Sequence, residues 1–568
     1  MNNSKRNNFD VTFASMYIAG FVILIASLFY YQILKGDYYL ARARNNYMRV
    51  IPERSIRGNI YDRNGIILAK DIASFNISVI PYQIKYKKDE LFRDISLYIN
   101  SSSKTLNRNY KRKFQNQFSP VDIIPDVDKE TAFRIKEKFG DDVLINPEPQ
   151  RVYLYPYEFA HVLGYVQDAS AFPENIKKYG YSPSERIGKT GIEEYYDNYL
   201  RGKDGGDLIE INSQGQIAGF LGKLNTERGQ DIHLTLDLNM QEAAYAVMKN
   251  KKGALIFMDS KSGDVLSLLS APAFNPNFFV KGSDELTGVF KDTHRPLQNR
   301  AIQSTYPLGS TFKPVVTIAA LEAKKITPLT TFNCEGKLKI GNTEFHCENV
   351  HGSENIYDAL IHSCNVYFYN AGMLTGREQI TKWADRLGLS SLTGIDLPYE
   401  NKGFIPGSNR GVIKHWYKGD TLNLSIGQGY VLSSPIEITS AFNTFANAGY
   451  SVKPHIISKL GDTDFRPIPA VKSGIPFDIL TILRNALRGV VESDEGTARM
   501  LRPLSLKISG KTGTAQAQGK AHGWFIGYFP YDDPKYTICV FLENAGSSYE
   551  ALKVANEFLS QLKEKNIL

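Results

Sequence analysis

Three short motifs with the residue types of acyl-transfer chemistry follow one another along the chain. Ser310 and Lys313 form an S-x-x-K motif, Ser363-Cys364-Asn365 forms S-x-N, and Lys511-Thr512-Gly513 forms K-T-G. A serine hydroxyl becomes a nucleophile when an adjacent base takes its proton, and the first motif supplies a lysine for that purpose. The ordered trio predicts a serine acyltransferase whose general base is a lysine and not a histidine.

The surroundings of Ser310 favour this chemistry. Gly309 precedes it and a helical pattern follows, so we expect the hydroxyl at a helix N-terminus, where backbone N–H groups stabilise developing negative charge. Lys313 lies three residues further on and therefore on the same helix face. Because a lysine removed from water has a lowered pKa, it can accept a proton. We predict Ser310 as the nucleophile and Lys313 as its base.

Similar motifs elsewhere in the chain lack this context. Ser101 and Lys104 also satisfy S-x-x-K, but within a polar stretch. Lys189-Thr190-Gly191 repeats K-T-G, but it follows no strand of useful length. A phosphate-binding loop needs glycine five positions before Gly188, and Pro183 stands there. A nucleotide-binding protein is therefore disfavoured, and order and context set the trio apart.

The composition is that of a folded protein with more than one domain. The chain has 568 residues, of which 42% are hydrophobic and 22% charged. This length predicts two or three domains, and this composition excludes wholesale disorder. The net charge of +8 is mild, and no lysine/arginine run is long enough for a nucleic-acid surface. The charge is compatible with an anionic membrane or a cell-wall polymer.

An apolar segment near the N-terminus predicts a membrane anchor. Val11–Leu34 contains 24 residues without a charge. As a helix it spans about 36 Å, enough for a hydrocarbon core of about 30 Å. A cleaved signal peptide has a shorter apolar region, although Ala41-Arg42-Ala43 resembles a cleavage site. The positive charges that follow the segment would place the large domain inside the cell, whereas the predicted chemistry belongs outside, and we expect the latter.

Two regions follow the anchor. In residues 35–228, Asn-Gly between two apolar runs predicts a hairpin over Asn59–Ala69. We expect no compact set of titratable residues here, and hence a spacer or docking domain. In residues 229–568, a helix is expected over Lys313–Lys325. Strands are expected over Gly253–Met258, Asp264–Leu269, Leu504–Ile508, Trp524–Phe529 and Tyr536–Leu542. Hairpin-linked strands with helices between them predict the α+β class, with an antiparallel sheet covered by helices.

The trio resembles that of the penicilloyl-serine transferases, the penicillin-binding proteins and serine β-lactamases. The rest of the chain resembles class B penicillin-binding proteins, most closely the elongation type, the penicillin-binding protein 2 group. Ser363–Tyr369 is more similar to this type than to the division type. Further similar segments are Arg57–Gly65, Ala160–Val166, Gly191–Glu193, Tyr306–Pro314, Ser425–Gly429 and His522–Gly527.

The resemblance implies an organisation and a place in the cell. It implies a five-stranded antiparallel sheet between helical layers, a mixed α/β pedestal or dimerisation-type domain, and one transmembrane helix. The expected segments are a cytoplasmic tail (1–10), the anchor (11–34), the non-catalytic domain (35–228) and the transpeptidase domain (229–568). The catalytic domain is then periplasmic, on the inner membrane.

The resemblance also implies roles for the motif residues. Ser310 attacks the D-Ala-D-Ala bond of a peptidoglycan stem peptide and Lys313 takes its proton. Ser363 relays protons to the leaving group, and Asn365 orients Lys313 and the substrate amide. The substrate carboxylate is bound by the last motif, which comprises Lys511, Thr512, Gly513 and Thr514.

The resemblance further implies partners and inhibitors. β-Lactams acylate Ser310 as substrate mimics. A SEDS-type glycosyltransferase and proteins of the rod-shape complex are the expected protein partners. Membrane lipid surrounds the anchor, and no nucleic acid is involved. The bond energy stays in the acyl ester, so the chemistry requires no cofactor.

Three cysteines and a histidine lie close together in the sequence. Cys334, Cys347, His351 and Cys364 have the spacing C-x12-C-x3-H-x12-C, and three thiolates with one imidazole make a closed tetrahedral zinc set. Some elongation-type relatives carry a metal here, with carboxylates at two of the positions. The alternatives are a Cys334–Cys347 disulfide or three unpaired thiols. Cys539 is expected in the core.

Two other functions on the same fold stay open. One is a hydrolase, either a D,D-carboxypeptidase or a β-lactamase, although a secreted β-lactamase has little use for a non-catalytic region of about 190 residues. The other is a catalytically silent β-lactam sensor, although the polar groups of the trio are all present.

Overall fold

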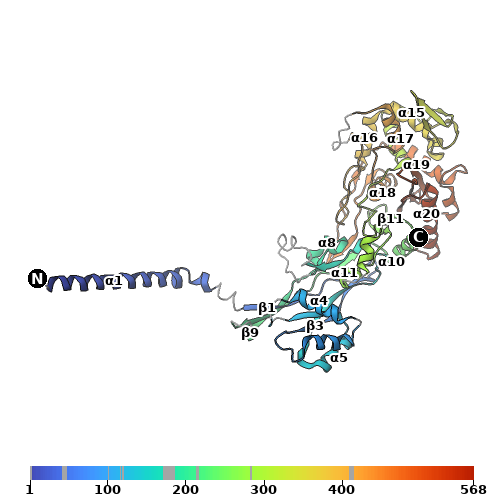
Figure 1. Cartoon of the computed structure of the whole chain (residues 1–568). Coiled ribbons are helices and arrows are strands. Elements are labelled where there is room, and N and C mark those ends of the chain that lie inside the picture. The colour runs from blue at the N-terminus through green and yellow to red at the C-terminus, as the bar shows by residue number, and fades with distance from the viewer. Residues whose placement is uncertain are drawn as a thin grey trace. The chain divides into compact units, whose positions relative to one another are not determined.

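A computed structural model of the chain describes residues 3–40, 48–99, 101–114, 117, 120–169, 186–212, 217–281, 285–407 and 415–568 (Figure 1). The chain divides into two compact units that alternate along the sequence. The N-terminal unit comprises Met1–Ile56, Ala73–Gln150 and Gly202–Arg228. The C-terminal unit comprises Arg57–Ile72, Arg151–Arg201 and Gly229–Leu568.

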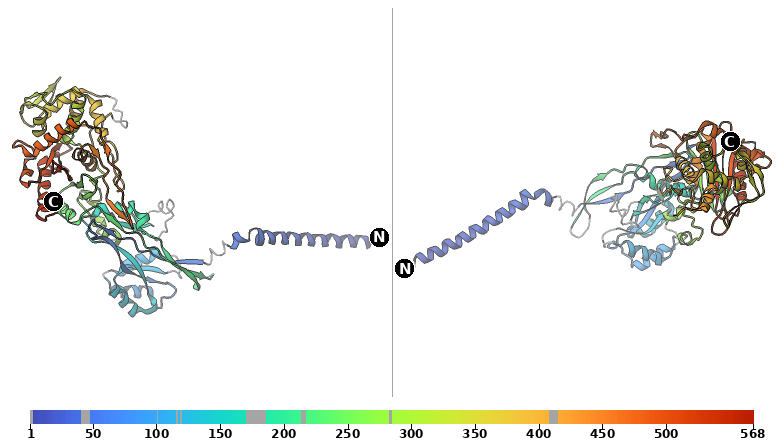
Figure 2. Two further views of the ribbon diagram at one scale, coloured as in Figure 1. Left: turned by 180° about the vertical axis from the view of Figure 1, so that it is seen from behind. Right: turned by 90° about the horizontal axis from the view of Figure 1, so that it is seen from above.

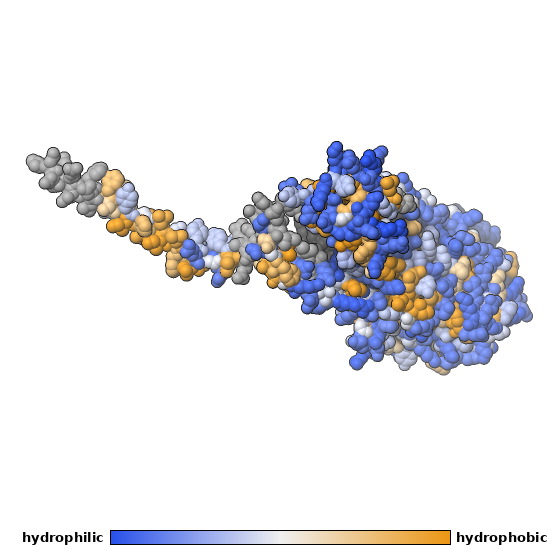
Figure 3. All heavy atoms as spheres, turned by 90° about the horizontal axis from the view of Figure 1, so that it is seen from below, coloured by the Kyte–Doolittle hydropathy of each residue, from blue (hydrophilic) through white to orange (hydrophobic). Residues whose placement is uncertain are grey.

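The N-terminal unit begins with the predicted apolar helix. Helix α1 (Asn3–Phe29) continues into a π-helical turn, η1 (Tyr30–Leu34). Its stretch Phe13–Leu34 is long and apolar enough to cross a membrane, and its side chains are exposed, as the orange surface in Figure 3 shows. This helix fits a single-pass membrane anchor. The alternative cleavage site at 41–43 lies outside the described residues.

The rest of the N-terminal unit mixes helices with antiparallel strands, as the pedestal prediction expected. One sheet has the strand order β1-β8-β9, and the end of β3 (Ile67–Val79) pairs with β4. Helix α4 packs onto β4 and against α3, and apolar side chains of all three elements share a small separate core. The bounds are β1 (Met48–Glu53), α3 (Lys88–Ser96), α4 (Ser103–Lys113), β4 (Val121–Val127), α5 (Lys129–Phe139), β5 (Leu144–Tyr153), β8 (Gly205–Ile211) and β9 (Ile217–Leu224).

The C-terminal unit is built on the predicted five-stranded antiparallel sheet, in the order β12-β11-β23-β22-β21. Four of the five predicted strands are confirmed, with bounds close to those expected. The strand that carries the K-T-G motif forms one edge of the sheet. The bounds are β11 (Gly253–Asp259), β12 (Val265–Ala271), β21 (Ser509–Ala515), β22 (His522–Phe529) and β23 (Tyr536–Leu542).

Successive side chains of a strand point to opposite faces of the sheet, so the apolar strands contribute to two cores, one on each face. Leu255 and Phe257 of β11 face the core that α10 (Leu238–Met248) and α20 (Ser548–Glu564) share. Ile256, between them, faces the larger core with α13 and α18 (Pro435–Ala446). The sheet therefore lies between helical layers, as predicted; the views of Figure 2 show helices on both of its faces.

The C-terminal unit contains further helices, and two of them begin at motif residues. The predicted helix at Lys313 is confirmed as α13 (Lys313–Glu322), which begins after the 3-10 turn η4 (Gly309–Phe312). The others are α6 (Ala160–Leu163), α8 (Gly191–Tyr195), α9 (Asp197–Leu200), α11 (Asn277–Lys281), α12 (Leu286–Lys291), α14 (Ile356–Ile361), α15 (Asn365–Thr375), α16 (Arg377–Arg386), α17 (Lys418–Ser425) and α19 (Phe477–Glu492).

Some short strands of the C-terminal unit form a second sheet, in the order β19-β18-β10-β2, in which β2 also pairs with the start of β3. The other short strands form separate two-stranded pairs. The predicted hairpin over Asn59–Ala69 is confirmed, because β2 pairs antiparallel with the start of β3. Between α13 and α14, β13 pairs antiparallel with β16, and the hairpin β14–β15 lies between these two strands in the chain. The bounds are β2 (Ile60–Tyr61), β6 (Val166–Asp168), β7 (Arg186–Gly188), β10 (Ile232–Leu234), β13 (Phe332–Cys334), β14 (Lys337–Ile340), β15 (Thr343–His346), β16 (Gly352–Glu354), β17 (Tyr450–Ser451), β18 (Ile457–Leu460), β19 (Thr463–Asp464) and β20 (Val471–Lys472).

One predicted strand is wrong. Leu504–Ile508 follows a 3-10 turn, η5 (Arg499–Leu504), and is not a strand. Ser505 and Lys507 have φ values of 57° and 55°, a left-handed conformation that an extended strand does not contain. The strand begins at Ser509 instead.

The expectation of no compact titratable set within residues 35–228 is also wrong. Arg57 donates to Glu193 and Asp197 at 2.8 and 2.9 Å, and Arg151 donates to Glu193 at 2.6 Å and to Asp71 at 3.2 Å. Glu193 is fully buried and both guanidinium groups are nearly so. This cluster ties three stretches of the C-terminal unit together that are far apart in the sequence.

Candidate active site

Three segments position the predicted motif residues. Ser310 lies half-buried in η4, at the N-terminal side of α13, as predicted, and Lys313 is the first residue of that helix. Ser363 lies in the connection between α14 and α15, and Asn365 begins α15. Lys511 lies in the middle of the edge strand β21.

The Lys313 ammonium joins the first two motifs. It is completely buried, and its Nζ lies 2.8 Å from Asn365 Oδ1, 2.6 Å from the Ser363 carbonyl oxygen and 3.2 Å from Ser363 Oγ. Burial lowers its pKa to about 8, against the opposing effect of the thiol groups of Cys347 and Cys364 and of the Glu348 carboxylate. A substantial fraction of Lys313 is therefore neutral near neutral pH and able to accept a proton.

Ser363 has an unusual backbone conformation. Its φ is +60°, in the left-handed region that costs a residue with a Cβ of order 1 kcal/mol. The next residue, Cys364, is the N-cap of α15 and accepts from the Tyr367 N–H at 3.5 Å. This turn directs both the carbonyl and the hydroxyl of Ser363 at Lys313.

The K-T-G strand lies directly beside the serine turn. A Cβ on Gly309 would come 2.5 Å from the Thr514 carbonyl oxygen, and a Cβ on Gly513 would come 2.8 Å from Thr311 Cγ2. Side chains at these two positions would push β21 away from η4. The glycines therefore permit the close approach of the first and third motifs.

The polar groups of β21 are partly engaged within the protein. Lys511 is buried and donates to the Thr512 carbonyl at 3.2 Å. Burial, and secondarily the Lys313 charge, lowers its pKa well below the usual range. The Thr512 hydroxyl donates to Thr497 Oγ1 at 2.9 Å, and Thr514 Oγ1 accepts from the Ser548 N–H at 3.1 Å. Among the described residues no acceptor binds the Thr514 hydroxyl proton, which can therefore bind a ligand.

The four candidate metal ligands also come together. One ligand atom from each of Cys334, Cys347, His351 and Cys364 lies within 4.8 Å of the other three. His351 Nδ1 lies 3.5 Å from Cys334 Sγ and 3.6 Å from Cys347 Sγ. All three cysteines are free thiols, as is the buried Cys539. Cys347 Sγ also accepts from the Asn365 N–H at 3.1 Å, so the cluster abuts the S-x-N motif.

Two segments outside the three motifs also lie near the site. The Gly309 N–H donates to the Gly427 carbonyl at 2.9 Å, and Thr497 contacts Thr512 as described. Ser425–Gly429 is similar to the family without containing one of the three motifs, and the sequence around Thr497 predicts no contact with Thr512. A serine, threonine or glycine in a loop carries no local signal of its distant partner.

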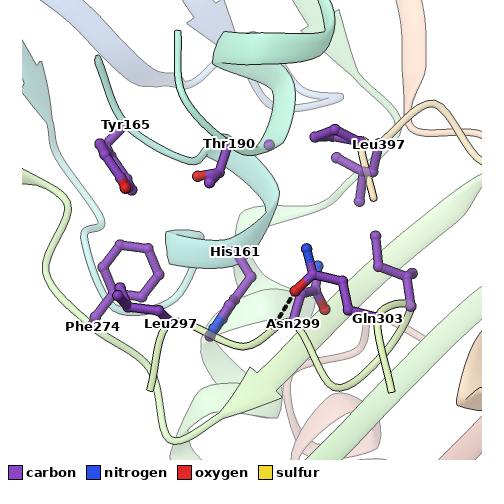
Figure 4. Close-up of a pocket in the computed structure, with 11 residues that line it drawn as sticks. His161, Tyr165, Thr190, Phe274, Leu297, Asn299, Gln303 and Leu397 are labelled. Atoms are coloured by element: carbon purple, nitrogen blue, oxygen red, sulfur yellow. Dashed lines mark hydrogen bonds between the residues drawn. The ribbon is translucent and has the colours of Figure 1, made fainter. Parts of the chain in front are cut away.

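An enclosed pocket elsewhere in the C-terminal unit does not contain the motifs. Its volume is about 40 Å³, and His161, Thr190, Asn299 and Gln303 are among its lining residues (Figure 4). His161 Nε2 contacts the Pro296 carbonyl at 2.7 Å, and burial lowers the pKa of the imidazole to about 4. The pocket has room for a few water molecules and not for a peptide.

Two family models match the chain. One, described as the penicillin binding protein transpeptidase domain, matches residues 253–564. The other, described as the penicillin-binding protein dimerisation domain, matches residues 52–234.

Similar proteins agree with these models over nearly the whole chain. The peptidoglycan D,D-transpeptidase MrdA of Salmonella typhimurium is 32% identical over 572 residues, which cover 93% of this chain and 91% of that protein. The PBP2 chain of Helicobacter pylori, in its complex with MreC, is 28% identical with a TM-score of 0.80 and covers 92% of this chain and 99% of its own. A chain from a structure on the coordination of polymerization and crosslinking by a peptidoglycan synthase complex is 28% identical with a TM-score of 0.72 and 97% coverage of both chains.

These likenesses confirm the predicted resemblance to penicillin-binding protein 2. The fold, the arrangement of the three motif segments and the two family models agree with one another. The chain belongs to the penicillin-binding proteins that combine a dimerisation domain with a transpeptidase domain.

Proposed function

We propose that this chain is a membrane-anchored peptidoglycan D,D-transpeptidase that cross-links stem peptides through an acyl-enzyme on Ser310. The observation that carries the proposal is the buried Lys313 amine, held by Asn365 and Ser363 at the start of the helix that follows the Ser310 turn. A buried lysine with a lowered pKa is the base that a serine needs where no histidine is at hand.

In the acylation half-reaction, neutral Lys313 takes the Ser310 hydroxyl proton. The oxygen attacks the carbonyl of the penultimate D-alanine, and the N–H groups of Ser310 and Thr514 stabilise the oxyanion. Ser363, at 3.2 Å from Lys313 Nζ, passes the proton to the leaving D-alanine. The substrate carboxylate binds at β21 through Lys511, Thr512 and Thr514, with Gly513 leaving room for the peptide.

In the second half-reaction, an amine of a neighbouring stem peptide attacks the ester. Its proton returns through Lys313 to the Ser310 oxygen, and the cross-linked peptide leaves. The bond energy of the cleaved peptide is kept in the ester, so the reaction needs no cofactor.

Covalent labelling tests the nucleophile. The full chain in detergent is incubated with a fluorescent penicillin, and stable labelling of the wild type with none of Ser310→Ala is expected. Ser101→Ala is a matched control, because Ser101 satisfies the same motif in the N-terminal unit. An adduct on any other side chain would contradict the proposal.

The fate of the label separates the competing functions. Slow loss of the label, together with transfer of a donor peptide to an amine acceptor, supports a transpeptidase. Rapid turnover of the label would identify a β-lactamase, and release of D-alanine without transfer would identify a carboxypeptidase. Labelling with no processing of peptide would identify a sensor.

We also propose that Cys334, Cys347, His351 and Cys364 hold a structural zinc ion. Tetrahedral zinc, with Zn–S of about 2.3 Å and Zn–N of about 2.05 Å, places sulfur and nitrogen ligands about 3.5 Å apart. The two sulfur–nitrogen distances of 3.5 and 3.6 Å fit that geometry. The ion would fix the turn that carries Ser363 and Asn365 and take no part in the acyl transfer.

Metal content tests this site. The purified chain is expected to contain about one zinc per molecule, and Cys347→Ser and His351→Ala are expected to lose it. Cys539→Ser is the control, since Cys539 lies buried in β23, outside the cluster. Equal metal content in all four proteins, or a disulfide between Cys334 and Cys347, would exclude the zinc site.

The cellular setting is a further part of the proposal. The anchor helix would place the catalytic unit in the periplasm, on the inner membrane. One similar chain was solved with MreC and another in a peptidoglycan synthase complex, which supports a rod-shape complex with an MreC-type protein and a SEDS-type glycosyltransferase. Co-purification of the full chain with these two proteins tests it, and full function after replacement of residues 1–40 would contradict a role for the anchor in docking.

A further inference from the structure

We propose that Glu348 binds an ammonium group of the peptide substrate at the mouth of the active site. The inference rests on the proposed transpeptidase function and adds a specificity-determining residue to it. Glu348 follows Cys347 directly and is exposed to solvent.

The residues just before Glu348 contact a catalytic residue. Asn365 Nδ2 donates to the His346 carbonyl at 3.2 Å, and the Asn365 N–H donates to Cys347 Sγ at 3.1 Å. Tyr369, one helical turn further along α15, donates to the same His346 carbonyl at 3.3 Å. Because consecutive Cα atoms are about 3.8 Å apart, Glu348 begins beside the Asn365 wall of the site.

The backbone on both sides of Glu348 is anchored. The Cys347 N–H donates to the Gly336 carbonyl at 2.8 Å. On the other side, the Asn349 carbonyl accepts from Cys334 Sγ at 3.5 Å. A turn held at both ends presents its side chain in a defined place, which a binding residue requires.

The Glu348 carboxylate has no partner among the described residues. It makes no hydrogen bond or ion pair with any of them, whereas Glu344 on the same hairpin pairs with Lys337 at 2.9 Å. Its charge nevertheless acts on both active-site lysines and raises the pKa of each, against the larger effect of burial. Glu348 therefore follows directly on residues that contact Asn365, and its charge lies within electrostatic range of Lys313 and Lys511.

This charge arrangement selects a cation at one edge of the site. Lys511 suits the carboxylate of the donor peptide, and Glu348 suits a positive group elsewhere on the peptide. In stem peptides that contain a diamino acid, the positive group is an ammonium. It has two sources: the side chain of the donor stem, or the amine of the acceptor stem before it loses its proton.

Peptide substrates with and without the ammonium test the proposal. The full chain in detergent acts on a thioester donor peptide whose side-chain amine is free or acetylated, and then on an acetylated donor with increasing amounts of an amine acceptor peptide. Wild type, Glu348→Gln, Glu348→Asp and the control Glu344→Gln are compared. Benzylpenicillin, which carries no ammonium, is the reference acylating agent.

The two sources predict different results. If the donor supplies the ammonium, Glu348→Gln reduces the preference for the free-amine donor about three- to fivefold, the effect of one exposed ion pair. If the acceptor supplies it, Glu348→Gln raises the acceptor concentration for half-maximal transfer by the same factor. In both cases Glu348→Asp retains part of the effect, and Glu344→Gln has none.

Other results would overturn the proposal. One is that Glu348→Gln changes neither the preference for the free-amine donor nor the acceptor concentration for half-maximal transfer, while its metal content and melting temperature equal those of wild type. Another is that it slows acylation by benzylpenicillin as much as by the free-amine peptide, because Glu348 would then act only through the lysines. If wild type reacts with neither compound, the proposed function itself fails.

Discussion

The pH dependence of acylation tests whether Lys313 is the base. Its pKa of about 8 means that about one molecule in ten is neutral at pH 7, against about three in ten thousand for a lysine with the ordinary value of 10.5. The neutral fraction at pH 7 is therefore about 300-fold larger, which corresponds to about 3 kcal/mol and to an advantage of the same size in the acylation rate. Burial of the amine is its main cause.

The sign of the effect follows from the active form. Only the neutral amine accepts a proton, so the acylation rate constant rises with pH. We expect about a tenfold rise from pH 6 to 7, a smaller rise up to pH 8 and a plateau above pH 9.

Stopped-flow measurement with a fluorescent penicillin, at saturating ligand, checks this profile. Saturation keeps the carboxylate of the ligand beside Lys511, so that titration of the empty Lys511 site does not contribute. Lys313→Arg, which stays charged throughout, is expected to be inactive at every pH. A rate that is constant from pH 6 to 9, or one that rises only near pH 10.5, would refute the role of Lys313.

Three substitutions test other parts of the structure. Asn365→Ala removes an acceptor at 2.8 Å from Lys313 and is expected to slow acylation about 10- to 100-fold, by the 1–3 kcal/mol of an unpaired buried donor; an unchanged rate would contradict this. Gly309→Ala places a Cβ 2.5 Å from a carbonyl oxygen of β21 and is expected to abolish penicillin labelling while circular dichroism stays unchanged. Arg151→Met leaves Glu193 with one arginine fewer, and a loss of about 3–5 kcal/mol in the free energy of unfolding is expected by denaturant titration; a loss below 1 kcal/mol would contradict it.

The parts of the fold that could be predicted are those that depend on local sequence patterns, such as runs of apolar residues between turns. Strands β11, β22 and β23 carry continuous runs of apolar residues between turns, and each appears where expected. The strand predicted at Leu504–Ile508 failed because a run of five residues does not reveal two left-handed backbone conformations. The number of strands came from the family resemblance and their order was not predicted, since pairing depends on contacts across nearly 300 residues.

In the candidate site too, local spacing was predictable and contacts between distant residues were not. The S-x-x-K spacing predicted that Ser310 and Lys313 lie on one helix face. The spacing of three cysteines and one histidine predicted the cluster that the structure contains. The salt bridge between Arg57 and Glu193 joins residues 136 positions apart, and no local sequence pattern predicts it. Likewise, that Glu348 has no partner among the described residues depends on the shape of a turn and not on its neighbours in the sequence.

The alternation of the two units has a practical result for dissecting this protein. The C-terminal unit draws on Arg57–Ile72 and Arg151–Arg201 as well as on everything after Gly229, and Ile60 and Phe159 are fully enclosed in its largest core. A fragment started at Gly229 would lose these side chains and expose the surfaces they cover, so we expect it to aggregate. We expect a soluble fragment only if it begins upstream of Arg57. A shorter functional version would need Arg57–Ile72 and Arg151–Arg201 supplied as separate peptides.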